Sequence, residues 1–287
     1  MVRVKDIEAI NARTLAEIAR GETPTGGYYG FVEIAFLGSP RFVMLHAADC
    51  NVSVIVMAKR EFEPASLAVW CHLSRTATGI LDIGAYSGIY ALAAAVRRPD
   101  LTIHAFEPNP YSVARLRTNR FSNGLSNIQE HPYGVGAENM RAQLMWLTKH
   151  LPYINSGASF MHTSPFDPKR FESAMADIRR IDEPDFCASL GDKALIKIDV
   201  EGAEAIAMQG LSRLLPQRPD FILETFSGPA CEAIDAMLSP YGYRAYFIDE
   251  QQRRLQRLPK MMPCDPAGAG MNLFLTTRDV LPLPEMV

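Results

Sequence analysis

The alternation of short apolar segments with helical segments, which begins near Gly79, constrains the fold of this chain more than any other feature. Five apolar segments have the length and the flanking glycine or proline typical of buried strands, and helical periodicity follows most of them. They are GILDIGAY (79–86), LTIHAFEP (101–108), NIQEHPYGVG (127–136), ALIKIDV (194–200) and PDFILETF (219–226). Strands separated by helices predict an α/β fold with a mostly parallel, doubly wound sheet. Apolar runs in the last 45 residues predict antiparallel C-terminal strands.

The residues before the first of these strands follow a different pattern, so we expect an N-terminal extension (1–62) and a main domain (63–287). Helical spacing predicts one helix near the N-terminus. FVEIAFL (31–37), RFVML (41–45) and NVSVIVM (51–57) predict two or three antiparallel strands. We expect this extension to cap the substrate or to form a contact between the subunits of a homodimer.

Composition and charge limit the partners that this chain can have. With 48% apolar and 21% charged residues, it resembles a globular protein with a substantial core. The formal net charge of -3 gives no overall field that would attract nucleic acid. The five cysteines are scattered without a CxxC pair, so we expect neither a zinc site nor a disulfide framework. This cysteine usage favours the reducing cytoplasm as the location of the protein. No apolar run reaches the roughly 18 residues that cross a membrane, so we expect no membrane partner.

The first predicted strand ends in a glycine turn that follows a carboxylate. Asp82 precedes Gly84 and Gly88, which permit a tight turn and close packing of the next helix. The middle glycine of the GxGxxG loop that cradles the pyrophosphate of NAD is missing. A carboxylate at this place would repel a pyrophosphate, but it suits the cationic amino acid end of S-adenosylmethionine. We therefore predict that this turn, including Ala85 and Ser87, binds that cofactor.

The second predicted strand also ends in an acid. Glu107 lies nineteen residues beyond Gly88, where an acid of a doubly wound sheet accepts the ribose hydroxyls of a bound nucleoside. Pro108 and Asn109 follow it and are predicted to contact the same ligand. NAD enzymes place an acid similarly, so Glu107 indicates an adenosine ribose rather than methyl transfer.

A lysine and two acids occur near the ends of the fourth and fifth predicted strands. Strand periodicity puts Lys197 and Asp199 on one face, about 6.6 to 7 Å apart. A lysine in a central strand is costly to bury unless it is paired, and Asp199 and Glu224 are its natural partners. We predict that Asp199 contributes to cofactor binding and acts as the catalytic base, with Lys197 or Glu224 setting its charge state. His162, in a loop that could close over the site, is an alternative base.

The segments LDIGAYSG, HAFEPNPYSVARLRTNRFSNG and IKIDVEGAEAIAMQGLSRLL resemble the FkbM-type methyltransferase family. The resemblance covers roughly residues 60 to 226. It implies the Rossmann-like class I methyltransferase fold, S-adenosylmethionine as cofactor, and O-methylation of hydroxyls on sugars or secondary metabolites. It also implies cofactor contacts by Asp82, Gly84, Gly88 and Glu107, and a reaction site lined by Asp199 and Glu201.

The long polar segment 149–169 is predicted to close over the acceptor, which is a small molecule or a glycan. Ser156 and His162 lie in this segment and are predicted to contact the acceptor. Mg²⁺ held by Asp199 and Glu201 is conceivable, but two carboxylates are too few ligands to support it. Two alternatives remain open, namely an NAD(P)-linked oxidoreductase and a non-catalytic relative that binds adenosyl compounds.

Overall fold

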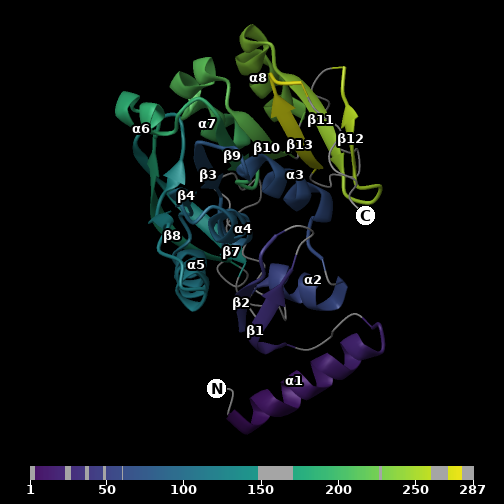
Figure 1. Ribbon diagram of the computed structural model, residues 1–287. Helices are drawn as coiled ribbons and strands as arrows, with labels where there is room; N and C mark the ends of the chain where they lie inside the picture. Colours follow the sequence, from purple (N-terminus) through teal and green to yellow (C-terminus); the bar gives the residue numbers. More distant parts are fainter. Residues whose placement is uncertain are drawn as a thin grey trace.

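The computed structural model describes residues 4–22, 27–35, 39–47, 50–59, 61–147, 171–225, 228–259 and 271–279. Its centre is an eight-stranded sheet with the order β12-β11-β13-β10-β9-β3-β4-β5 (Figure 1). The strands are β3 (Gly79–Ile83), β4 (Ile103–Phe106), β5 (Ile128–His131), β9 (Ala194–Ile198), β10 (Asp220–Thr225), β11 (Arg244–Asp249), β12 (Arg254–Arg257) and β13 (Met271–Thr276). The five strands from β10 to β5 are parallel, whereas β13, β11 and β12 pair antiparallel. The predicted α/β fold with antiparallel C-terminal strands is confirmed.

Helices cover both faces of this sheet and bury a separate core on each. One face is covered by α3 (Pro64–Ser74), α4 (Ile89–Arg97) and α5 (Pro110–Ser122). The other is covered by α6 (Pro184–Ser189), α7 (Glu204–Gln209), the 3₁₀ helix η1 (Ser212–Gln217) and α8 (Gly228–Leu238). Parallel strands buried on both faces explain why the sequence shows continuous apolar runs rather than alternation. Among the described residues, no helix is long and apolar enough to cross a membrane.

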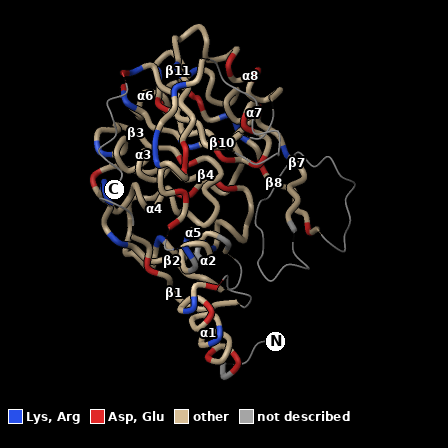
Figure 2. Tube along the Cα trace, turned by 90° about the vertical axis from the view of Figure 1, so that its right-hand side faces the viewer, with Lys and Arg blue, Asp and Glu red and all other residues tan. Residues whose placement is uncertain are grey.

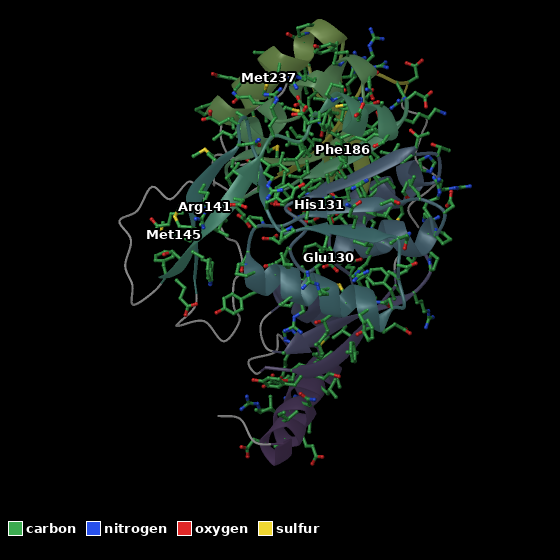
Figure 3. All side chains as sticks on the ribbon, turned by 90° about the vertical axis from the view of Figure 1, so that its left-hand side faces the viewer. Glu130, His131, Arg141, Met145, Phe186 and Met237 are labelled. Carbon is green, nitrogen blue, oxygen red and sulfur yellow. The ribbon has the colours of Figure 1, made fainter. Side chains whose placement is uncertain are left out.

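A small second sheet lies beside the main one and has the order β6-β8-β7. It contains β6 (Gly134–Val135), β7 (Met140–Leu147) and β8 (Phe171–Arg179). Figure 3 shows it projecting from the body, with Arg141 and Met145 labelled on β7. The segment RAQLMWLT (141–148) predicts β7, and the third predicted strand continues through position 136, but the sequence indicates neither β8 nor α6. The chain instead leaves the main sheet at His131.

The N-terminal residues form α1 (Val4–Ala19), a hairpin of β1 (Tyr29–Ile34) and β2 (Phe42–Ala47), and α2 (Asn51–Lys59). Both Figure 1 and Figure 2 show α1 at the end of the molecule, beyond the hairpin. The prediction of a strand over 51–57 is wrong, because these residues belong to α2. Val52 and Val56, four residues apart, are both buried, as expected for one side of a helix. The run NVSVIVM alternates at its start and is then continuously apolar, so its periodicity does not separate a strand from a helix.

Two asparagines near the end of α5 hold the N-terminal hairpin against the main domain. Asn123 bonds both backbone polar groups of Val43, at 2.8 and 2.7 Å. The Asn119 side chain accepts a hydrogen bond from the Leu45 backbone N–H at 2.7 Å and donates to the Ser87 carbonyl at 2.8 Å. These amides offer the edge strand β2 the donors and acceptors that a neighbouring strand would provide. Through Asn119, the hairpin is linked to the turn that follows β3.

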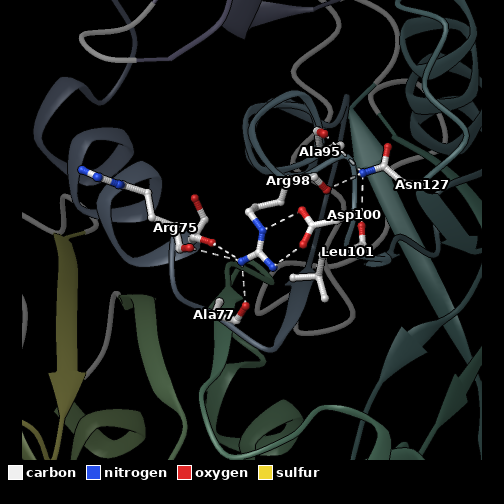
Figure 4. A network of polar contacts seen from close by, with 8 residues as sticks. Arg75, Ala77, Ala95, Arg98, Asp100, Leu101 and Asn127 are labelled. Atoms are coloured by element: carbon white, nitrogen blue, oxygen red, sulfur yellow. Dashed lines mark hydrogen bonds and ion pairs between the residues drawn. The ribbon is translucent and has the colours of Figure 1, made fainter.

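The connections at the amino ends of the parallel strands are held by two other polar side chains (Figure 4). Arg98, paired with Asp100, donates to three carbonyls of the α3–β3 connection at 2.8 to 3.3 Å. Asn127 donates to three carbonyls of the α4–β4 connection at 2.9 to 3.2 Å. These bonds satisfy helix-end and loop carbonyls that intrahelical bonds cannot reach. The strands are therefore fixed at this end, and the predicted site lies at the opposite end.

Candidate functional site

The turn after β3 requires glycine at two places. Gly84 and Gly88 have φ values of 83° and 95°, in the left-handed region. A Cβ on Gly84 would lie 1.6 Å from the backbone oxygen of Asp199, and one on Gly88 would lie 2.3 Å from Leu116. The chain thus turns directly against the end of β9 and against α5. This close packing is why the turn carries glycine here, whatever ligand it binds.

Asp82 lies near the end of β3 and is almost completely buried, with 2% of its surface exposed. Its Oδ2 accepts a hydrogen bond from the backbone N–H of Ala91 at 2.9 Å, in the first turn of α4. Burial raises the pKa of Asp82 to about 7. A cationic ligand beside this carboxyl would favour its ionised form and lower this pKa.

Glu107 follows β4, and its carboxylate links the turn after β3 to the turn after β4 through hydrogen bonds. Its Oε2 accepts from the Tyr86 N–H and its Oε1 from the Asn109 N–H, both at 2.8 Å. Burial raises the pKa of Glu107 to about 7, against these two hydrogen bonds. Each carboxylate oxygen has two lone pairs, so both oxygens retain acceptor capacity for ligand hydroxyls. The structure places this carboxylate beside the glycine turn, as the sequence predicted.

The other residues predicted to bind cofactor have structural roles of their own. The Ala85 N–H pairs with the Phe106 carbonyl at 3.0 Å. Ser87 is fully buried, and its hydroxyl accepts from the Cys50 thiol at 3.3 Å. Asn109 is buried and caps α5 by accepting from the Tyr111 N–H, while Pro108 is half-buried. These contacts shape the turn, and the cofactor contacts of these residues stay predictions.

A row of polar side chains crosses four strands on the face that α3 and α4 cover. In strand register, Asp82 is opposite Lys197, and Glu224 is opposite Asn272. The strand period of two puts Lys197 and Glu224 on the same face, because Lys197 is opposite Ile222. We call Asp82, Lys197, Glu224 and Asn272 the polar row.

Lys197 is the centre of the polar row and is 1% exposed. Its Nζ lies 3.2 Å from Asp199 Oδ2 and 3.2 Å from Asn272 Oδ1. It also lies 5.2 Å from the centre of the Tyr90 ring. The predicted partnership with Asp199 is present and closer than the backbone spacing suggested, because Asp199 has left the strand and turns back. The contact with Asn272 was not predicted, and its signal was a lone amide in the apolar segment MNLFLTT.

The charges of this group follow from burial and from one another. Burial raises the pKa of Asp199, but the Lys197 ammonium and a hydrogen bond with Glu224 outweigh it and leave that pKa below its ordinary value. Burial and the Asp199 charge raise the pKa of Glu224 to about 10. At neutral pH, Asp199 is therefore an anion, Lys197 a cation, and Glu224 a neutral acid that donates to Asp199.

The two glutamates of the IDVEGAE segment lie in different local structures. Glu201 lies in a left-handed turn before α7, with φ of 54° and an exposed side chain. Glu204 begins α7 and accepts from the Gly202 N–H at 2.7 Å. Glu204 therefore stands in the first turn of α7, whereas Glu201 precedes the helix. The glutamate at 201 is turned outward, next to Asp199.

The predicted acceptor loop, with Ser156 and His162, lies outside the described residues. The role of these two side chains therefore stays a prediction. Within the described ranges, no group of three or more His, Cys, Asp or Glu side chains could hold a metal ion. The Mg²⁺ considered for Asp199 and Glu201 has no further support.

A group of aromatic rings beside the strand ends was not predicted. His131 stacks on Phe106 at 4.3 Å and on His104 at 5.3 Å between ring centres, and Phe186 packs edge-on against His104. Figure 3 labels His131 and Phe186. Burial, His104 and Arg179 lower the pKa of His131 to about 4, so it is neutral at physiological pH. No sequence motif connects these residues, since they come from separate elements.

The strand order, with acids ending β3 and β4 around a glycine turn, defines the class I methyltransferase fold. The chain belongs to the family described as the Methyltransferase FkbM domain, whose model matches residues 82–245. A relative named Methyltransferase 1, from Beauveria bassiana (strain ARSEF 2860), is 27% identical over 146 residues. That match covers 46% of this chain and 57% of the relative, so the chain spans little more than half of that protein.

Two solved structures illustrate the similarity of fold. One is a SAM-dependent O-methyltransferase from Thermotoga maritima, with a TM-score of 0.42 and 12% identity, covering 89% of this chain and 80% of that one. The other is a SAM-dependent methyltransferase from Agrobacterium tumefaciens, with a TM-score of 0.44 and 12% identity, covering 89% and 72%. Both TM-scores are below 0.5, so the family assignment rests on the sequence match.

Proposed function

We propose that this protein is an S-adenosylmethionine-dependent methyltransferase that methylates a hydroxyl of a small-molecule or glycan acceptor, such as a sugar or a secondary metabolite. The observation that carries the proposal is the pair of buried carboxyls Asp82 and Glu107 beside one glycine turn. Burial raises the pKa of each to about 7. Such a pair disfavours a pyrophosphate and suits a nucleoside that carries a sulfonium and an ammonium group.

The residues present fit this cofactor. Glu107 has acceptor capacity for two ribose hydroxyls, and Asp82 has a carboxylate for the ammonium group. Asp199 adds a third charge, kept negative by Lys197 at 3.2 Å and by the neutral Glu224. When bound, the cofactor supplies an electrophilic methyl group, so the protein has mainly to position the acceptor oxygen in line, about 3 to 3.5 Å away.

Asp199 can serve as the base despite its lowered pKa. Its carboxylate orients the acceptor by accepting the hydroxyl hydrogen bond. An acceptor hydroxyl becomes strongly acidic when its oxygen is methylated. A weakly basic carboxylate such as Asp199 would therefore suffice to take up its proton. Glu201, exposed at the same turn, is assigned to acceptor binding.

The proposal is tested by calorimetric titration of the protein with S-adenosylmethionine, S-adenosylhomocysteine and NAD. We expect the two adenosyl compounds to bind and NAD not to bind. Tighter binding of NAD would favour the oxidoreductase alternative, and no binding of any of the three would refute the proposal. Methyl transfer from labelled S-adenosylmethionine to a panel of hydroxylated acceptors separates an enzyme from a non-catalytic relative.

A further inference from the structure

Glu63 adopts a backbone conformation that its local structure does not explain. It occupies the N-cap position of α3 with φ of 40° and ψ of 58°, in the left-handed region that disfavours a residue with a Cβ. A residue at this position ordinarily accepts a hydrogen bond from the first helical turn. The Glu63 side chain makes no such bond. Its carboxylate accepts instead from the hydroxyl of Tyr90.

The capping of α3 is provided by a distant residue. The Glu250 carboxylate, from the end of β11, accepts from the backbone N–H groups of Ala65 at 2.7 Å and Ser66 at 3.0 Å. It also accepts from the Ser66 hydroxyl. Because Glu250 satisfies the helix start, Glu63 is released from that task. Formation of α3 therefore requires neither the left-handed backbone of Glu63 nor its hydrogen bond with Tyr90.

Tyr90 connects Glu63 to the polar row. It stands in the first turn of α4, is 5% exposed, and lies with its ring 5.2 Å from Lys197 Nζ. The Trp70 ring packs edge-on against it at 5.5 Å, and the Trp70 indole donates to the Tyr90 carbonyl at 2.9 Å. The ring is thereby fixed in one orientation. Its hydroxyl reaches Glu63 while its face contacts the ammonium.

Glu63 also interacts electrostatically with Lys197, the residue that it reaches through Tyr90. Burial lowers the pKa of the Lys197 ammonium, but the charges of Asp199 and then of Glu63 raise that pKa above its ordinary value. Burial raises the pKa of Glu63 itself, while the Lys197 ammonium and the Tyr90 hydrogen bond favour its ionised form. Lys197 thus interacts with carboxyls of β9 and β10 and also with one from the start of α3. If Asp199 were its only ionised partner, the Lys197 ammonium would cancel the negative charge of Asp199.

We infer that Glu63, acting through Tyr90, is a positioning residue of the reaction site that holds Lys197 between two carboxylates and leaves negative charge on Asp199 for a cationic ligand. This inference rests on the proposed function, since the cationic ligand is S-adenosylmethionine. S-adenosylhomocysteine, which S-adenosylmethionine becomes after it loses the methyl group, has nearly the same shape but no sulfonium charge. The ratio of the two affinities therefore reports the charge of the site rather than the integrity of the fold.

The test uses the full chain with Glu63→Gln and Tyr90→Phe, alone and combined. Glu61→Gln is the matched control, because Glu61 lies two residues away and pairs with Arg253 on the surface at 2.6 Å. Affinities for both adenosyl compounds are measured by calorimetry, and folding is checked by thermal melting. We expect both single variants to lower the preference for S-adenosylmethionine over S-adenosylhomocysteine at least fivefold. The double variant should lose no more than either single one, because the two residues form one link.

The outcomes separate this inference from the proposed function. If the wild-type protein binds neither compound, the proposed function fails, and the inference fails with it. If the wild type binds both and the affinity ratio is unchanged in Glu63→Gln and Tyr90→Phe, only the inference is refuted. An equal weakening of both compounds would show a structural role for Glu63 and would also refute it. An unchanged ratio in Glu61→Gln is required for support.

Discussion

The backbone carbonyl of Asp199 lies against Gly84, and a Cβ at position 84 would stand 1.6 Å from its oxygen. We expect Gly84→Ala to lower the free energy of unfolding by more than about 2 kcal/mol, because the clash adds to the cost of a positive φ. The control is Gly124→Ala, since Gly124 has φ of 63° and no heavy atom within 4 Å of the place that a Cβ would take. It should cost only about 1 kcal/mol. Equal losses in urea denaturation would contradict this account.

Asp82 and Glu107 predict that cofactor affinity depends on pH. Both have a pKa of about 7 in the free protein. An ammonium group bound at Asp82 and ribose hydroxyls donating to Glu107 would each favour the ionised form. Affinity for S-adenosylmethionine should therefore rise between about pH 6 and pH 8, with release of protons on binding. Calorimetry in buffers of different ionisation enthalpy measures that release. Uptake of protons, or none, would show that these carboxyls do not meet the cation.

The same raised pKa values predict the pH dependence of stability. Because the folded-state pKa of Asp82 lies above its ordinary value of 3.8, the contribution of Asp82 is complete below that value and is lost as pH rises towards 7. A difference of one between the folded and unfolded pKa values corresponds to about 1.4 kcal/mol. Asp82→Asn should thus flatten the fall in free energy of unfolding between about pH 4 and pH 7 while weakening cofactor binding. An unchanged slope in urea denaturation would contradict the assignment.

Asn119 and Asn123 provide a matched pair that separates stability from cofactor binding. Both hold β2, but Asn119 also donates to the Ser87 carbonyl in the glycine turn. Either alanine variant should cost about 1–3 kcal/mol of stability, since buried polar groups lose their partners. Cofactor affinity should fall in Asn119→Ala and stay within about twofold in Asn123→Ala. Equal affinities in calorimetry would show that the turn does not depend on the hairpin.

Glu224 and Lys197 should respond differently to neutral replacements. Glu224 is a neutral acid at pH 7, since its pKa is raised to about 10, so Glu224→Gln preserves its charge and a donor. Cofactor affinity and melting temperature should change little. Lys197→Met leaves the Asp199 carboxylate without its ammonium and should cost about 3–5 kcal/mol. If Glu224→Gln were as damaging as Lys197→Met in thermal melting, Glu224 would have to be ionised.

The parallel strands and the acids at their ends were predictable from the sequence, whereas contacts between side chains of separate elements were not. Buried parallel strands give long apolar runs, so β3, β4, β9 and β10 and the residues at their ends could be located. The prediction for 51–57 was wrong because this run alternates like a strand at its start and is too short to show a helical period. Asn272 and Tyr90 reach Lys197 only through the folding of β13 and α4, and no spacing in the sequence records that meeting.

The segment matched by the family model is smaller than the unit that can fold. It begins at Asp82, inside β3, and ends at position 245, the second residue of β11. A truncated protein with these limits would lack β13, which pairs with both β10 and β11. The truncated protein would also lack α3, which covers part of one face of the sheet. The apolar residues uncovered there would make the truncated protein prone to aggregation. Shorter versions for crystallography or engineering should therefore retain everything from α3 through β13.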